Sequence, residues 1–410
     1  MKHGCSTDAV TQDLRQAHPP LDPEGIKNNP EFYRIHYRLL GEISRSDRAY
    51  NAWLNRMLRP AGIERPLDSN TIQAAFYLNE ATKYLDALLD LLPKRRASAL
   101  QTHPRIFECN DFRELLDVAL NSSNRRLAFE AQRKMYLAKL FFDVAHTRNI
   151  QHGEEHRAFF ARGMDHDIMS HTVEEKDIDI AFNISSDGVS IDYKVGRPLS
   201  NQEVWRFRRR EINFMQDGRP VRIYIYFYSC RSKREVLPYR YVRGKQVYKL
   251  RTVEKWTKLS MRRDASIVNK MLRTGETNPN AIHDIIGVMF IVEDLIQVEH
   301  LKFALYDRLG GPFKIRNVVD TLSYPADRTR LNRYSGAGYC VYKGDVDVLY
   351  YPEHGTEPPY SFIVEIQLYT LETYLRTIHE NHYASHHRLK RRQFLEGLAP
   401  LLFPREIYGS

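Results

Sequence analysis

Apolar residues recur at helical spacing along the first third of the chain. From residue 71 to residue 92 they fall near every 3.6 positions, and Pro93 follows, as expected where a helix ends. Two further segments repeat the spacing, residues 112–120 and 127–146. We therefore predict a helical region over residues 31–165. The polar segment before it, residues 1–30, contains a Pro-Pro pair and is predicted to be a flexible tail.

The pattern changes to period two near residue 177. Residues 177–184 and 189–195 alternate apolar with polar side chains around a Ser-Ser-Asp-Gly turn, which predicts a β-hairpin. Residues 221–229 and 240–250 have the character of two more strands, the second broken at Gly244. We therefore predict a β-rich section over residues 166–250.

After residue 252 the chain mixes both patterns. The predicted helices are residues 266–274, 297–309 and 370–396, and the predicted strands are residues 285–292, 345–351 and 361–368. This order favours an α+β fold in which helices pack on a sheet, with residues 251–410 as its C-terminal domain. A chain of 410 residues is long enough for two or three domains.

The positive charge of the chain is concentrated in one segment. The chain has 61 Lys+Arg and 51 Asp+Glu, a net charge of +10. Residues 201–274 alone contain 20 Lys+Arg against 6 Asp+Glu, so this segment, which begins in the β-rich section, is basic and the rest of the chain is slightly acidic. Such a segment is either a solvated face or a binding surface for phosphate-bearing ligands.

Composition also narrows the class of protein. The longest apolar run, residues 285–292, is much shorter than the ~20 residues of a membrane span, and the first residues lack the apolar stretch of a secretory signal. We therefore expect a cytoplasmic protein that does not cross a membrane. The four cysteines lie far apart in the sequence, which favours neither a zinc knuckle nor a disulfide framework.

A cluster of cations surrounds the start of the predicted helix at residue 266. Lys258, Arg262 and Arg263 precede this helix, and Lys270 and Arg273 lie about one turn apart on it. Cations beside the free backbone N–H groups of a helix start favour an anion such as phosphate. These five residues are therefore candidate phosphate ligands.

Two carboxylates accompany apolar strands further on. Asp284 stands at the start of the strand over residues 285–292, where it is either a turn residue or a ligand for Mg²⁺ bridging phosphate oxygens. In the strand over residues 361–368, alternation places Glu365 and Gln367 on the face opposite the apolar residues Val364 and Ile366. A carboxylate there suits a general base or a second metal ligand.

The order of these segments resembles the synthetase domain of the RelA/SpoT family. Residues 253–403 contain, in order, S-I-x-x-K-M, D-I-x-G-V, G-Y and E-I-Q-x-x-T, followed by a His-rich helix. That family transfers pyrophosphate from ATP to the 3′-hydroxyl of GDP or GTP, giving ppGpp or pppGpp. The resemblance implies a mixed sheet with flanking helices, related to nucleotidyltransferases.

The resemblance also implies roles for individual residues. Asp284 would bind Mg²⁺, and Glu365 would be the base or a second metal ligand. Arg262 and Lys270 would contact the phosphates of ATP, Tyr339 would stack on the acceptor base, and Gln367 would support the same site. The partners implied are ATP and a guanine or adenine nucleotide.

Several positions depart from the family pattern. Ser260 and Met289 stand where the family has arginines, so Lys258 or Arg263 would have to replace the first of them. Three more departures follow, Ala337 for asparagine, Lys343 for histidine and Tyr369 for arginine. These positions mainly hold the nucleotide and the acceptor, so the pattern leaves open a different acceptor or a loss of activity.

Other acidic and histidine-rich segments offer rival sites. The pairs Asp177/Asp179 and Asp345/Asp347 have the D-x-D spacing of two-metal nucleotidyltransferases, although alternating strands also produce this pattern. A histidine group resembles in part the hydrolase domain that precedes the synthetase in long RelA/SpoT proteins. It comprises His152, His156, His166 and His171 with Asp167. The C-terminal basic residues, His382, His386, His387, Arg388, Lys390, Arg391 and Arg392, favour a basic surface over a metal site.

Three hypotheses about function remain open. The chain is an alarmone synthetase, a toxin-type RelA/SpoT enzyme that pyrophosphorylates tRNA 3′ ends, or a non-catalytic RNA-binding or sensor protein. The basic section would favour tRNA through phosphate contacts. Its aromatic residues are either base-stacking platforms or core residues. They are Tyr224, Tyr226, Phe227, Tyr228, Tyr239 and Tyr241.

Overall fold

The chain folds into two compact units, each assembled from segments that are distant in sequence. The computed structural model describes residues 7–24, 30–59, 71–164, 168–185, 190–199, 205–207, 210–232, 247–248, 264–324, 326–327, 331, 333–336, 338–352, 358–379, 384 and 386–409. The first unit comprises Met1–Gln151, Val253–Ile282 and Arg391–Ser410, and the second comprises His152–Thr252 and His283–Lys390. The segment predicted as the C-terminal domain, residues 251–410, is therefore distributed over both units.

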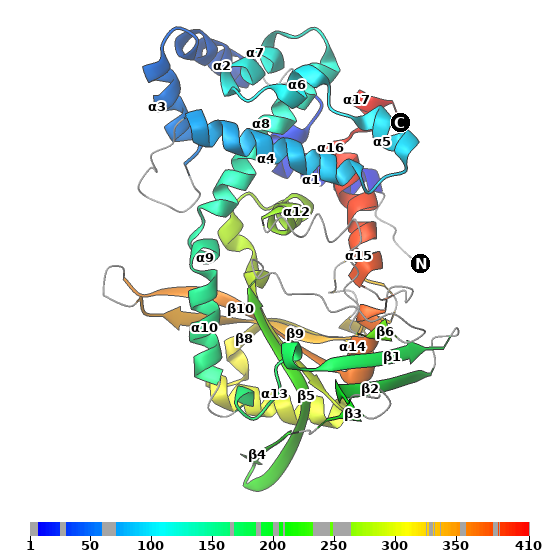
Figure 1. Cartoon of the computed structure of the whole chain (residues 1–410). Coiled ribbons are helices and arrows are strands. Elements are labelled where there is room, and N and C mark those ends of the chain that lie inside the picture. The colour runs from blue at the N-terminus through cyan, green and yellow to red at the C-terminus, as the bar shows by residue number, and fades with distance from the viewer. Residues whose placement is uncertain are drawn as a thin grey trace. The chain divides into compact units, whose positions relative to one another are not determined.

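Helices build the described part of the first unit. They are α1 (Thr7–Ala17), α2 (Pro30–Ile43), α3 (Asp47–Met57), α4 (Thr71–Leu89), α5 (Lys94–Leu100), α6 (Pro104–Glu108), α7 (Phe112–Asn121), α8 (Arg125–Ala145), α9 (Arg148–Gln151), α12 (Ala265–Thr274), α16 (Ala399–Leu402) and α17 (Arg405–Tyr408). The long helix α8 packs against α4 and α7 (Figure 1). Four helices predicted from apolar spacing are confirmed as α4, α7, α8 and α12.

Helix α1 lies in the segment predicted to be a flexible tail. His18, which follows α1, is fully buried. Its Nδ1 lies 2.6 Å from the Tyr136 hydroxyl of α8, and its Nε2 lies 3.2 Å from the Met271 carbonyl oxygen of α12. Arg15 forms an ion pair with Glu406 at 2.9 Å. These tertiary contacts hold α1 against the unit, whereas the polar composition of this segment by itself predicts a tail.

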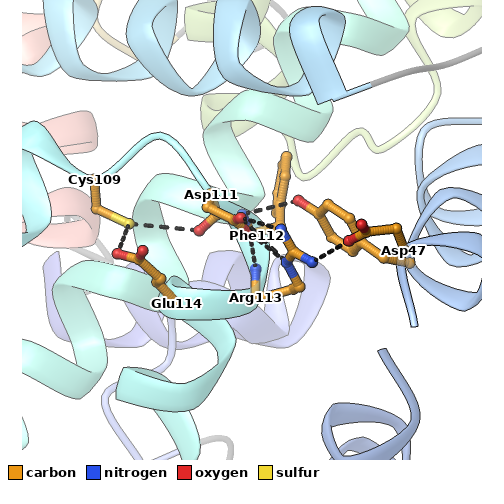
Figure 2. A network of polar contacts seen from close by, with 7 residues as sticks. Asp47, Cys109, Asp111, Phe112, Arg113 and Glu114 are labelled. Carbon is orange, nitrogen blue, oxygen red and sulfur yellow. Dashed lines mark hydrogen bonds and ion pairs between the residues drawn. The ribbon is translucent and has the colours of Figure 1, made fainter. Parts of the chain in front are cut away.

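A polar network fixes the start of α7 (Figure 2). Asp111 is the N-cap, and its carboxylate accepts a hydrogen bond from the Arg113 backbone N–H at 2.7 Å. The Arg113 guanidinium binds the same carboxylate and also Asp47, each at 2.8 Å. Burial raises the pKa of the Asp111 carboxyl, but the bonds from Arg113 outweigh burial and hold this pKa below its usual value. Because Asp47 begins α3, this network joins α3 to α7.

The second unit contains a six-stranded mixed sheet with the strand order β4-β5-β7-β10-β9-β8 (Figure 1). Its strands are β4 (Arg210–Gln216), β5 (Arg219–Ser232), β7 (Ile286–Val292), β8 (Ile315–Asp320), β9 (Tyr342–Tyr350) and β10 (Tyr360–Thr370). The central strands β7 and β10 are parallel, and the other neighbouring pairs are antiparallel. The strands predicted over residues 221–229, 285–292, 345–351 and 361–368 are confirmed.

A smaller sheet has the order β3-β2-β1-β6. It consists of β1 (Asp179–Ile184), β2 (Ile191–Pro198), β3 (Trp205–Arg206) and β6 (Val247–Tyr248). The antiparallel pairing of β1 with β2 confirms the predicted hairpin. Of the strand predicted over residues 240–250, Val247 and Tyr248 form β6, and the other residues lie outside the described ones.

The two faces of the six-stranded sheet are covered differently. Helices α10 (Gly153–Met164) and α13 (Leu295–Leu309) contact the sheet, and His156 of α10 stacks on Phe362 of β10 with ring centroids 4.4 Å apart. On the other face, Tyr369 packs in a core with residues of β1 and α14 (Leu371–Ile378). Glu365 and Gln367 lie on this second face, before the point where the core begins.

The prediction of one long helix over residues 370–396 is wrong. Helix α14 ends at Ile378 because His379 has an extended backbone conformation, with φ −77° and ψ 113°. The next described helix is α15 (His386–Arg392), which is followed by a π-helical segment, Gln393–Leu398. The apolar stripe in this segment therefore belongs to separate helices.

The expected α+β class is confirmed by the mixed sheet and its flanking helices. Among the described helices, none combines the length and the apolar character that a bilayer span requires.

Candidate functional site

The middle of β10 has one apolar face and one polar face. Val364 and Ile366 are fully buried, whereas Glu365 and Gln367 are only half-buried. The predicted alternation is therefore confirmed. Polar side chains at this spacing on a central strand cost free energy unless they bind each other or a ligand.

A row of charged residues crosses the sheet at Glu365. Glu365 lies opposite Gly287 of β7 on one side and opposite Asp345 of β9 on the other. The row extends to Arg231 of β5, opposite Gly287, and to Arg316 of β8, opposite Asp345. Gly287 contributes no side chain, and among the described residues a Cβ there would approach the Glu365 carbonyl oxygen at 3.8 Å. The row thus combines carboxylates and guanidinium groups around one position without a side chain.

Lys343 and Gln367 hold the carboxylate of Glu365. The Lys343 ammonium donates to Glu365 Oε2 at 3.4 Å, and the Gln367 amide donates to Oε1 at 2.5 Å. Burial by itself lowers the pKa of Lys343, but the ion pair with Glu365, together with contributions from Tyr339 and Asp284, outweighs burial and raises this pKa above its usual value. Lys343 is therefore a cation at neutral pH.

Asp284 belongs to the same group of charges. It lies in the short helical turn η5 (His283–Ile285), which contacts β10. Its backbone, with φ −93° and ψ 32°, departs from helical geometry and lets the chain turn into β7. Its charge contributes to the raised pKa of Lys343. Glu365 thus bonds to Lys343 directly, whereas Asp284 acts on the same ammonium group through its charge.

A tyrosine pair extends the network beyond Gln367. The Tyr369 hydroxyl lies 2.8 Å from the Tyr339 hydroxyl and donates to Gln367 Oε1 at 3.4 Å. The two rings meet at 64° with centroids 6.3 Å apart. Burial raises the pKa of both phenols, so both hydroxyls stay protonated at neutral pH. The chain of contacts runs from Tyr339 through Tyr369, Gln367 and Glu365 to Lys343.

The departures from the family pattern meet in this network. Lys343 and Tyr369 bond directly to members of the network. Met289 lies opposite Gln367, which itself lies opposite Lys343. Three departures that are distant in sequence therefore surround Gln367. Ser260 and Ala337 lie outside the described residues.

The predicted phosphate ligands are divided between helix α12 and residues outside the described ones. Lys270 and Arg273 lie on α12, which belongs to the first unit, while Asp284 and Glu365 belong to the second. Lys258, Arg262 and Arg263 lie outside the described residues. The five cations stay predictions as substrate ligands.

Mg²⁺ stays a prediction from the chemistry of the two carboxylates. Among the described residues, His, Cys, Asp and Glu side chains form no group of three or more that could enclose a metal. Mg²⁺ typically takes one or two carboxylates together with substrate phosphates and water. Asp284 and Glu365 match that smaller requirement.

The rival acidic pairs have other partners. Asp347 is exposed and pairs with Arg316 at 2.5 Å, and Asp177 pairs with Arg197 at 3.6 Å. Asp345 is buried and accepts hydrogen bonds from His283 and Asn317. The D-x-D spacing thus separates into side chains with different surroundings.

Of the histidine group predicted as a rival hydrolase site, the structure describes His152, His156 and His171, and the ring centroids of His152 and His156 lie 6.1 Å apart. His156 is fully buried and its Nε2 lies 2.7 Å from the Tyr360 hydroxyl. His152 pairs with Glu155 at 2.9 Å, and His171 is exposed. His166 and Asp167 lie outside the described residues.

The aromatic residues of β5 serve mainly the core. Phe227 and Tyr226 are buried, and Tyr226 stacks on Phe207 with centroids 5.6 Å apart. Tyr239 and Tyr241 lie outside the described residues. The core interpretation is thus confirmed for Phe227 and Tyr226.

Sequence reasoning treated Lys343 only as a departure and did not select His283 or Asn317. A signal existed for Lys343, because period two along β9 places it on the same face as Asp345 and Asp347. His283 and Asn317 reach Asp345 through the arrangement of three separate elements, which local sequence does not reveal.

Comparison with known proteins gives partial likenesses. No protein-family model matches the sequence, and no curated protein matches it. Small alarmone synthetase 1 from Bacillus subtilis bound to its product pppGpp shares 20% identity over 27% of this chain and 52% of its own, with a TM-score of 0.22. This chain therefore spans about half the length of that protein.

Two more solved structures are similar to parts of the chain. Another structure of small alarmone synthetase 1 from Bacillus subtilis shares 16% identity over 45% of this chain and 78% of its own, with a TM-score of 0.24. A GTP pyrophosphokinase family protein from Streptococcus pneumoniae shares 22% identity over 35% and 60%, with a TM-score of 0.23. At such TM-scores, any functional argument rests on the residues of this chain.

Proposed function

We propose that this chain is an ATP-dependent pyrophosphokinase that transfers pyrophosphate to the 3′-hydroxyl of GDP or GTP. One observation carries the proposal. Glu365, on the central strand β10, bonds to Lys343 on a half-buried face of the sheet, and Asp284, in the turn η5 just before the parallel neighbour β7, adds its charge to the surroundings of the same ammonium group. The transfer of a phosphoryl-type group requires positioned carboxylates and cations more than covalent chemistry by the protein.

The side chains have complementary roles in the proposed reaction. The acceptor hydroxyl oxygen attacks the β-phosphorus of ATP, and the bond from this phosphorus to the α–β bridging oxygen breaks, so that AMP leaves. The hydroxyl proton passes to Glu365, which Gln367 and Lys343 orient. Lys343 offsets negative charge on the phosphate oxygens. Asp284 and Glu365 would hold Mg²⁺, which supplies further positive charge to the phosphates when bound.

The remaining residues shape the acceptor side of the site. Tyr339 is fixed by its hydroxyl contact with Tyr369, and its ring is the proposed stacking surface for the acceptor base. Two alternatives use the same residues differently. In one the acceptor is the 3′ end of tRNA, and in the other the chain binds RNA without catalysis.

Transfer of a label tests the proposal directly. The full chain is incubated with γ-labelled ATP, Mg²⁺ and one acceptor at a time, GDP, GTP, ADP or tRNA, and the labelled products are separated. We expect label on GDP or GTP. Asp284→Asn and Glu365→Gln should each reduce the rate by about 1000-fold, while thermal unfolding stays unchanged because both side chains lie on a half-buried face.

The control is Asp347→Asn, which removes a carboxylate on the same strand as Lys343 but one that pairs with Arg316. It should retain the wild-type rate. Label on tRNA or ADP would replace the proposed acceptor. If no acceptor is labelled, the enzymatic proposal is overturned.

A further inference from the structure

His283 and Asp345 form a hydrogen-bonded pair beside the candidate site. His283 Nδ1 lies 2.9 Å from Asp345 Oδ2. The Asp345 residue is 7% exposed, whereas the His283 side chain is 39% exposed. Since an ionised carboxylate only accepts hydrogen bonds, Nδ1 carries the proton. In the neutral ring, Nε2 therefore presents a lone pair.

Asn317 gives Asp345 a second donor, and the local backbone is shaped for this contact. The Asn317 amide donates to the same Oδ2 at 2.8 Å. Asn317 has φ 53° and lies where the pairing of β8 with β9 shifts between Arg316 and Val319. Asn tolerates this left-handed conformation better than most residues.

Gly344 allows β8 to lie close to β9 at this shift. A Cβ at Gly344 would meet Ile315 Cγ2 at 2.4 Å and the Arg316 carbonyl oxygen at 3.1 Å. Any larger residue would therefore push β8 away. The bond from Asn317 to Asp345 therefore depends on three local features. They are the glycine at position 344, the irregular pairing of β8 with β9, and the left-handed backbone of Asn317.

The pair lies next to the carboxylates proposed for catalysis. Asp345 is directly opposite Glu365 in the sheet, where Cβ atoms are typically 4.5–5.5 Å apart. His283 precedes Asp284 in η5, which contacts β10. Within the part of the chain that the structure describes, Nε2 of His283 makes no hydrogen bond. The imidazole is thus oriented on its Nδ1 side and available on its Nε2 side.

We propose that His283 contacts the acceptor through Nε2, which accepts a hydrogen bond from a ribose hydroxyl, and that Asp345 and Asn317 are positioning residues. This inference rests on the proposed function. A hydroxyl is the preferred partner because a lone pair on Nε2 accepts from O–H but repels the oxygens of a phosphate, which are themselves acceptors. The contact selects an acceptor with free ribose hydroxyls.

Two substitutions of His283 distinguish a contact with the acceptor from a purely structural role. The amide nitrogen of an asparagine stands near the place of Nδ1 and keeps the bond to Asp345, whereas the amide of a glutamine stands near the place of Nε2. A structural role predicts that His283→Asn resembles the wild type. A contact with the acceptor predicts that His283→Gln resembles it more closely.

The measurement uses whichever acceptor the wild-type chain labels, with KM determined separately for acceptor and ATP. His283→Asn should raise the acceptor KM about tenfold, the value of one hydrogen bond, without changing the KM for ATP or the thermal midpoint. His283→Gln should stay within about threefold of wild type. Asn317→Gly keeps the left-handed backbone but removes the amide, and should raise the acceptor KM about threefold.

Asp347→Asn serves again as the control and should leave both KM values unchanged. The inference is overturned if His283→Asn matches the wild type, if the KM for ATP rises in place of the acceptor KM, or if both His283 variants lose stability alike. These outcomes leave the proposed function standing. A wild-type chain that labels no acceptor overturns both proposals.

Discussion

The two units bury charge in opposite ways. In the first unit, helix α8 contains Glu130, Arg133 and Lys134, all with at most 1% of their surface exposed. Lys134 donates to the carbonyl oxygens of residues 106, 107 and 109 at 2.6–2.9 Å. In the second unit, Lys343 and Glu365 are half-buried and bond to other side chains.

This difference in bonding partners distinguishes charged residues that stabilise packing from charged residues that can bind a substrate. A charge enclosed by backbone groups fixes the packing of the segments that provide them, as Arg133 does by donating to the Leu402 carbonyl oxygen at 2.5 Å. Burial lowers the pKa of Lys134 to about 8, but its three carbonyl partners leave no position for a ligand. Charges that bond to each other on a partly open face can exchange those bonds for a substrate. Three substitutions test this contrast.

The largest effect on stability is expected for Arg133→Leu. The change leaves the Leu402 carbonyl and the Thr102 hydroxyl without their donor, so the free energy of unfolding should fall by about 3 kcal/mol. Urea unfolding followed by circular dichroism measures this loss. The transfer rate per folded molecule should not change. Arg125→Leu, which removes an exposed arginine at the start of the same helix, should cost less than about 1 kcal/mol.

A smaller, pH-dependent effect is expected for Asp143→Asn. Burial raises the pKa of Asp143 to about 6, although Lys139 partly opposes this. The folded state therefore binds more protons than the unfolded state between about pH 4 and pH 6, and Asp143 reduces stability as pH rises through that range.

Asp143→Asn removes this dependence. The variant should be more stable than the wild type by about 2 kcal/mol at pH 8 and equal to it near pH 4. Unfolding of both proteins across this range is the measurement. A constant difference at all pH values would show that Asp143 is ionised in the fold without penalty.

The smallest effect is expected for Tyr369→Phe. The change removes the hydroxyl that contacts Tyr339 and Gln367 but keeps the ring in its core. We expect the acceptor KM to rise about threefold to fivefold, near 1 kcal/mol or less, with little change in kcat. The control, Tyr374→Phe, removes a hydroxyl bonded to Glu175 at 3.0 Å, and should affect stability but not KM.

Much of the local structure could be predicted from residue pattern. Helices α4, α7, α8 and α12 and the β1–β2 hairpin follow from periodicity and turn residues. Strand β4 was missed, although Asp217-Gly218, with φ 50° and 74°, forms the tight turn that joins it to β5. A helix over residues 370–396 was predicted because apolar spacing continues past the extended residue His379.

The residues of the candidate site likewise fall into two groups, those that the sequence predicts and those that it does not. Asp284, Glu365 and Gln367 could be selected from the sequence, because polar residues within apolar strands need a partner. The roles of Lys343, Asn317 and His283 could not, because each depends on a neighbour between 22 and 62 positions away. Likewise, residue patterns indicate that residues 285–292 and 361–368 are strands, but not that they are parallel neighbours.

The sequence by itself determined helices α4, α7, α8 and α12, the β1–β2 hairpin, the concentration of charge in residues 201–274, and which face of β10 is polar. These properties depend on neighbours a few residues apart. Only the tertiary structure decided that α12 joins the first unit, that Glu365 bonds to Lys343, and that Asp345 bonds to His283. The physical reason is that strand order and helix packing are chosen by the burial of whole faces, which sums contributions from distant segments.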